Sequence, residues 1–233
     1  MLPLEGHEGE VTCVAFSPDG TLLASGSVDK TIRLWQAGTA NLVETIACEE
    51  EVFDLSFAPD GKTLVWGGIH NGPRIWDIAA HRVAGMFEGR TKGKWQSVAF
   101  AADGRTFAAG VGPGRSGVPR GYLDYGGVTL WDPRSVEVPL HIDTNNQPIW
   151  DLGVSPDGRL LAIGFQWSGV GIRDLRIGKQ WALIEKGNLE ATAYGLAFSP
   201  DGKTLAATMG NDVEIWDATR NTLYSARVGM ADF

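Results

Sequence analysis

The chain has 233 residues, 43% of them hydrophobic and 31 of them glycine, and its formal net charge is −8. This acidic balance argues against a nucleic-acid partner and favours a partner with basic groups. The N-terminus lacks a cationic start followed by an apolar stretch, and the apolar runs are too short to span a bilayer, so we expect a cytoplasmic protein without membrane contact. Two cysteines, Cys13 and Cys48, predict neither a disulfide framework nor a metal site.

The first strands and turns are predicted from residues 11–46. A short, partly β-branched apolar run at 11–16 predicts a strand, and Ser17-Pro18-Asp19-Gly20 predicts a tight turn after it. Residues 22–27, 31–35 and 42–46 predict three further strands. Apolar residues on both faces of these strands indicate a sheet that is covered by neighbours on both sides.

The same turn motif, an Asp-Gly pair, recurs along the whole chain. Asp-Gly pairs end at Gly20, Gly61, Gly104, Gly158 and Gly202, at intervals of about 40 to 55 residues. A period of this length indicates stacked copies of one supersecondary unit. We therefore expect five repeats in a single all-β domain over 1–233, with approximate bounds 6–46, 47–87, 88–142, 143–186 and 187–228. Four short antiparallel strands per repeat, arranged radially, predict a β-propeller.

The stretch GHEGEVTCVAFSPDGTLLASGSVDKTIRLW, residues 6–35, resembles a WD40 repeat almost residue for residue. Three later repeats carry the Trp-Asp pair, as Trp76-Asp77, Trp131-Asp132 and Trp216-Asp217, whereas the fourth has Arg173-Asp174. The resemblance covers essentially the whole chain. It implies five four-stranded WD40-type blades and an interaction platform without catalysis of its own.

The resemblance also implies a buried polar network inside a repeat. It is formed by His7, Ser25 or Ser27, Asp29 and Trp35 in the first repeat. The later repeats have other residues at the histidine position, namely Cys48, Thr91, Asn145 and Leu189, and His70 and Trp167 stand at two of the aspartate positions. A Ser-His-Asp catalytic interpretation is disfavoured, because catalysis also needs an open site and an oxyanion hole.

Five repeats leave the closure of the ring open. Residues 2–4 and residues 223–228 both occupy places of an outermost strand, although a closed five-bladed ring needs only one of them. Either the chain is part of a larger propeller, with blades in a longer or second chain, or it closes with five blades and a spare terminus. We favour the larger propeller.

An insertion at 111–126 lies between the second and third strands of the third repeat. Gly112, Gly114 and Gly117 match GxGxxG, but Pro119 follows where a phosphate-binding helix would begin, so we expect no nucleotide. The segment is either a flexible loop or a binding loop. In the second case its contact residues are Arg115, Arg120, Tyr122, Asp124 and Tyr125.

In the family, such loops share a "top" face with the starts of the first strands. Aligned on the turn, the starting positions are Thr12, Phe53, Gln96, Trp150 and Tyr194, with Trp95 one place before Gln96. The next positions are Cys13, Asp54, Ser97, Asp151 and Gly195. An aromatic and acidic rim would suit a peptide with basic side chains. The alternative is that these aromatic residues only pack between blades.

We therefore expect a non-catalytic scaffold module that binds a protein or peptide on its top face. One alternative is a regulatory or sensor segment of a larger signalling protein. Another is a propeller enzyme or small-molecule binder that uses Asp54 and Asp151 in the central channel. No cofactor or metal is expected, because His7, His70, His81 and His141 lie far apart in the repeat and lack paired ligands.

Overall fold

The computed structural model describes residues 3–69, 72–87, 93–101, 104, 106–112, 127–132, 140–145, 147–175, 179–184, 192–210, 212–219 and 222–229, with the backbone alone for 179–184 and 222–229. Strands are the only long regular elements in these ranges. No helix that could cross a membrane occurs among them.

Twenty strands form five antiparallel sheets of four strands each, which we call blades 1 to 5. Blade 1 contains β1 (Val11–Phe16), β2 (Leu22–Ser27), β3 (Thr31–Gln36) and β4 (Leu42–Ala47). Blade 2 contains β5 (Asp54–Phe57), β6 (Thr63–Gly67), β7 (Arg74–Asp77) and β8 (Arg82–Met86). Blade 3 contains β9 (Trp95–Phe100), β10 (Phe107–Val111), β11 (Val128–Trp131) and β12 (Leu140–Ile142). Blade 4 contains β13 (Ile149–Val154), β14 (Leu160–Phe165), β15 (Val170–Asp174) and β16 (Lys179–Ile184). Blade 5 contains β17 (Ala193–Phe198), β18 (Thr204–Met209), β19 (Asp212–Asp217) and β20 (Thr222–Gly229).

The turn between β1 and β2 of blade 1 is formed by Ser17-Pro18-Asp19-Gly20, as the sequence predicts. The Ser17 hydroxyl donates to Asp19 Oδ1 at 2.6 Å, and the Leu22 amide donates back to Ser17 Oγ at 2.9 Å. Gly20 has φ +68°, in the left-handed region that glycine adopts without steric cost. The other four repeats have a glycine with φ between 62° and 69° at the same place, namely Gly61, Gly104, Gly158 and Gly202. The expected hairpins are therefore present.

The hydrophobic core lies between blades. Buried apolar side chains form four clusters, one at each junction of consecutive blades. At the first junction Ile32 and Leu34 of blade 1 cluster with Leu55 and Leu64 of blade 2. Full burial of one such side chain contributes roughly 1.5–3 kcal/mol. A blade therefore needs a neighbour in order to bury its faces.

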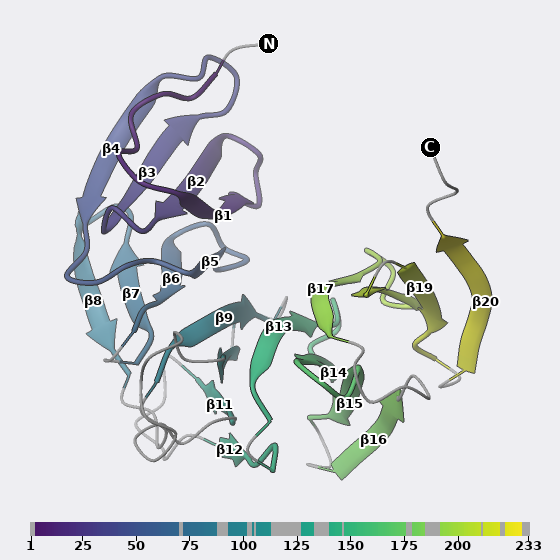
Figure 1. The fold of residues 1–233 in the computed structure, drawn as a ribbon. Coiled ribbons are helices and arrows are strands. Elements are labelled where there is room, and N and C mark those ends of the chain that lie inside the picture. Colours follow the sequence, from purple (N-terminus) through teal and green to yellow (C-terminus); the bar gives the residue numbers. More distant parts are fainter. Residues whose placement is uncertain are drawn as a thin grey trace.

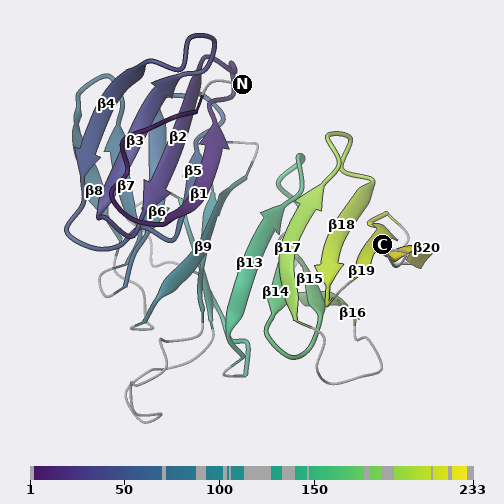
Figure 2. The ribbon, with the colours of Figure 1, turned by 45° about the horizontal axis from the view of Figure 1, so that its top comes forward.

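The inner strands of successive blades contact one another in chain order, β1 with β5, β5 with β9, β9 with β13 and β13 with β17. Blades 1 and 5 stand apart in both views, so the described blades form an open arc (Figure 1, Figure 2). At the two ends of the arc, the exposed apolar side chains include Val14 and Phe16 on β1 of blade 1 and Val213 on β19 of blade 5.

Candidate functional site

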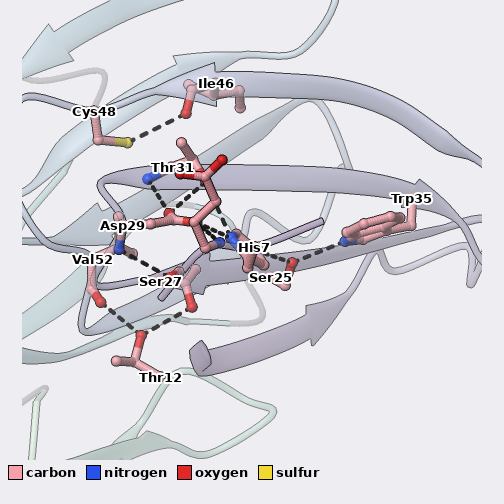
Figure 3. A network of polar contacts seen from close by, with 12 residues as sticks. His7, Thr12, Ser25, Ser27, Asp29, Thr31, Trp35, Ile46, Cys48 and Val52 are labelled. Carbon is pink, nitrogen blue, oxygen red and sulfur yellow. Dashed lines mark hydrogen bonds and ion pairs between the residues drawn. The ribbon is translucent and has the colours of Figure 1, made fainter. Parts of the chain in front are cut away.

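A linear chain of hydrogen bonds connects four side chains of blade 1, in the order Asp29, His7, Ser25 and Trp35 (Figure 3). His7 lies 2.8 Å from Asp29 through Nδ1 and 2.8 Å from Ser25 Oγ through Nε2. The Trp35 indole N–H donates to Ser25 Oγ at 2.9 Å, and Trp35 is buried. The network uses Ser25, whereas the Ser27 hydroxyl oxygen accepts the backbone amide of Asp29. The polar groups of these side chains thus find their hydrogen-bond partners inside the blade.

The charge of Asp29 is stabilised by this network. Burial opposes ionisation of the carboxyl, but hydrogen bonds from Thr31, His7 and the Glu8 amide outweigh it and hold the pKa of Asp29 well below its usual range. Thr31 donates to Asp29 Oδ1 at 2.7 Å. The first repeat is therefore held by a carboxylate that stays ionised at all ordinary pH values.

Asp54 and Asp151, which the sequence analysis expects at the top rim, each accept a hydrogen bond from the following blade. Asp54 of blade 2 accepts the Val98 amide of blade 3 at 2.8 Å. Asp151 of blade 4 accepts the Leu196 amide of blade 5 at 2.6 Å. Backbone donors of the following blade thus occupy both carboxylates.

Ser97 of blade 3 lies between the two aspartates. Its hydroxyl oxygen is 3.0 Å from Asp54 Oδ2 and 3.1 Å from Asp151 Oδ1, and it accepts the Leu152 amide at 3.1 Å. One hydroxyl has a single hydrogen, so it donates to only one carboxylate at a time. The alignment placed Ser97 beside the two acids, but its link across three blades depends on the geometry of the inner strands.

Burial raises the pKa of Asp54 to about 7, with a further contribution from the nearby charge of Asp151, while the hydrogen bonds from Val98 and Ser97 oppose the increase. Burial also raises the pKa of Asp151, and the Leu196 and Leu152 amides oppose it. The Asp54–Ser97–Asp151 group therefore carries less negative charge near neutral pH than two free carboxylates would.

The aromatic rim residues fall into different environments. Trp150 and Tyr194 form a tilted pair with ring centroids 5.5 Å apart, and Tyr194 is 57% exposed. Phe53 is buried and has Lys94 Nζ 3.9 Å from its ring centroid. Trp95 is fully buried and packs against Trp131 in the core between blades 2 and 3. Of these side chains, Tyr194 offers the most accessible surface.

A family model described as "WD domain, G-beta repeat" matches residues 2–36 and 185–217. Its first match covers the His7 network and the first three strands of blade 1. The chain therefore contains WD40 repeats.

Relatives of this WD40 chain include longer proteins. Protein Mut11 of Chlamydomonas reinhardtii is 57% identical over 42 residues, which are 18% of this chain and 11% of that protein. The serine-threonine kinase receptor-associated protein of Gallus gallus is 52% identical over 50 residues, or 20% of this chain and 14% of that protein. Periodic tryptophan protein 2 of Arabidopsis thaliana is 25% identical over 240 residues, covering 100% of this chain and 25% of that protein. The WD40 chain thus spans between about a tenth and a quarter of the length of these relatives.

Other residues considered in the sequence analysis either lie outside the described part of the chain or are thiols that burial keeps protonated. Arg115, Arg120 and Tyr122 of the insertion lie outside the described residues, as does most of the segment 111–126. Cys13 and Cys48 are free thiols, and burial raises the pKa of each to about 12. No group of three metal-ligating side chains occurs in the ranges given above.

Blade 4 departs most from the WD40 pattern among the described blades. Arg173 pairs across the strands with Leu161, as Trp35 pairs with Leu23 in blade 1. The positions of Ser25 and Asp29 are taken by Ile163 and by Trp167, which is 52% exposed. None of the polar contacts of the His7 network is therefore available there.

Proposed function

We propose that this chain is a non-catalytic WD40 module that binds a protein or peptide at the rim formed by the starts of its inner strands. WD40 proteins in general bind other proteins and act as scaffolds. The observation that carries the proposal is the Trp150–Tyr194 pair, which spans blades 4 and 5 and leaves Tyr194 57% exposed. Exposed aromatic anchors of this kind contribute much of the energy of protein interfaces.

A partner with basic side chains fits this rim. The ring faces of Tyr194 and Trp150 attract a cation, and the alkyl stem of a Lys or Arg side chain packs against them. We assign direct contact to the aromatic pair and a supporting negative potential to Asp54 and Asp151, because backbone amides already occupy those carboxylates. Phe53 of blade 2 is buried and already has Lys94 over its ring, so we assign it no direct contact with the partner. The insertion residues Arg115, Arg120 and Tyr122 remain candidates for a second contact.

The test selects peptides from a random displayed library on the immobilised chain and titrates the selected peptides. We expect sequences enriched in Lys and Arg, and at least tenfold weaker binding by Tyr194→Ala and Trp150→Ala. Met86→Ala is the matched control, because Met86 on the outermost strand β8 is 56% exposed but far from the inner strands. Selection of acidic peptides, or equal binding by all variants, would contradict the proposal.

We also propose that further WD40-type blades cover the two ends of the arc. Val14 and Phe16 on β1 are each 63% exposed. By alignment on the turn they correspond to Leu196 and Phe198 of blade 5, which pack against the core shared with blade 4. Blade 1 thus presents the face that elsewhere in this chain meets a preceding blade. The greater length of the relatives is consistent with additional segments.

A further inference from the structure

Blade 4 has a cavity where blade 1 has its polar network. In blade 1 the Trp35 indole, Ser25 and His7 fill the space beside β2 and β3. At the corresponding place in blade 4 a cavity of about 90 Å³ is lined by Ile163, Phe165, Gly171 and Arg173, and by the preceding loop residues Asp143, Thr144, Asn145 and Gln147. The substitution of arginine for tryptophan and of glycine for Arg33 removes the atoms that would fill it.

A second cavity of about 210 Å³ shares two lining residues with the first. It lies between β12 of blade 3 and the end of β15, and Leu140, Ile142 and Leu175 contribute apolar walls. Asp143 and Arg173 line both cavities. At about 210 Å³ the larger cavity is smaller than the sites of drug-sized ligands, which begin at about 300 Å³, so it suits a small molecule.

The Arg173 guanidinium is incompletely engaged. In the described part of the chain its one hydrogen bond goes from Nη2 to the Asp143 carbonyl oxygen, at a long 3.4 Å. A guanidinium has five N–H donors and a planar fork that matches a carboxylate. Four donors therefore remain for solvent or for a ligand.

The carboxylates near Arg173 differ in availability. Asp174 is buried and bound to Arg159 Nε at 2.7 Å, so its charge is already compensated. Asp143 is exposed, and one of its oxygens accepts the Asn145 amide at 2.7 Å. Among the described residues no cationic side chain forms an ion pair with Asp143. The lining therefore offers one available positive charge and one available negative charge beside an apolar wall.

We propose that these two cavities, which share Asp143 and Arg173, bind a small zwitterion, an α-amino acid with an aliphatic side chain. The ligand carboxylate pairs with Arg173, its ammonium group pairs with Asp143, and its side chain packs against Leu140, Ile142 and Leu175. A ligand with only a carboxylate would leave the negative charge of Asp143 unbalanced next to its own, and an amine alone would face the guanidinium. None of the lining residues belongs to the proposed rim, so this proposal does not depend on it.

The test titrates the chain calorimetrically with three matched probes: leucine, 4-methylpentanoate, which lacks the amine, and 3-methylbutylamine, which lacks the carboxylate. We expect leucine to bind at least tenfold more tightly than either analogue. Equal binding of one analogue would overturn the zwitterion assignment, and absence of leucine binding would overturn the site. Because these probes act on the unaltered chain, the result does not depend on the folding of a variant.

Substitutions of the lining residues test whether leucine binds at these cavities. Arg173→Met and Asp143→Asn should each weaken leucine binding at least tenfold, whereas Arg82→Met, which removes a charge from an exposed position on β8, should leave it unchanged. Arg173→Trp should abolish binding by placing an indole in the cavity, with the melting temperature maintained. Unchanged leucine binding in Arg173→Trp would show that leucine binds elsewhere and would overturn the proposal.

Discussion

At the scale of single residues, the aspartates of this chain behave in two opposite ways. Asp29 receives enough hydrogen bonds to keep its charge inside blade 1. Asp54 is buried between blades near another acid, which disfavours its charge. Both are bonded to backbone amides, so the difference arises from burial and from the neighbouring carboxylate of Asp151.

This difference predicts a pH dependence that Asp54 controls. Its pKa is about 7 in the folded chain and 3.8 in the unfolded chain, so the folded state binds more protons between these values. The contribution of Asp54 to the free energy of unfolding is therefore fully present below about pH 4 and is lost as the pH rises to about 7. Denaturant unfolding of the wild type and of Asp54→Asn at intervals over this range measures it.

We expect the difference in stability between wild type and Asp54→Asn to shift in favour of the variant as the pH rises. Asparagine keeps an acceptor oxygen for the Val98 amide, so the comparison isolates the ionisation. A constant difference across the range would show that the carboxyl ionises as easily in the folded chain as in water.

At the scale of elements, each hairpin depends on a turn glycine with positive φ. Gly20 illustrates the effect cleanly, because a Cβ added there would have no atom within 4 Å. Gly38, in the turn between β3 and β4, has equally open surroundings, but its φ lies outside the left-handed region. The two positions therefore separate backbone strain from crowding.

Gly20→Ala should destabilise the chain by about 1–2 kcal/mol, the cost of a left-handed conformation for a residue with a Cβ. Gly38→Ala should leave the free energy of unfolding within about 0.5 kcal/mol of the wild type. Chemical denaturation of both variants gives the comparison. Equal effects at the two positions would contradict an origin in the φ angle.

At the scale of the whole molecule, the arc leaves two different faces uncovered. The face of blade 1 with Val14 and Phe16 is of the kind that meets a preceding blade, and the face of blade 5 is of the kind that meets a following one. In blade 5, Val213 is 38% exposed. Unlike faces of this sort associate head to tail.

The isolated chain should therefore self-associate as its concentration rises, and Phe16→Asp should make it monomeric with an unchanged circular dichroism spectrum. Light scattering over a concentration series measures the mass, and Met86→Asp provides an equally exposed control on β8. A monomer at every concentration, with small-angle scattering of a closed ring, would indicate that five blades close on themselves.

The sequence alone determined the fold class, the strands of blade 1 and the turns, because these depend on local chemistry. The alternation of apolar residues and the Asp-Gly turns act over a few residues, so the expected strands at 11–16 and 22–27 match β1 and β2. The WD40 resemblance, carried by residues 6–35, was confirmed.

Only the tertiary structure decided how the blades meet, because those contacts join residues that are distant in the sequence, such as Asp54 and Val98. It selected Ser25 over Ser27 as the partner of His7, and it buried Trp95 in the core although the sequence placed it beside the rim. It directed Asp54 onto the Val98 amide of the next blade. It also left Arg173 beside an open cavity, since the space that an absent indole would fill depends on every neighbouring strand.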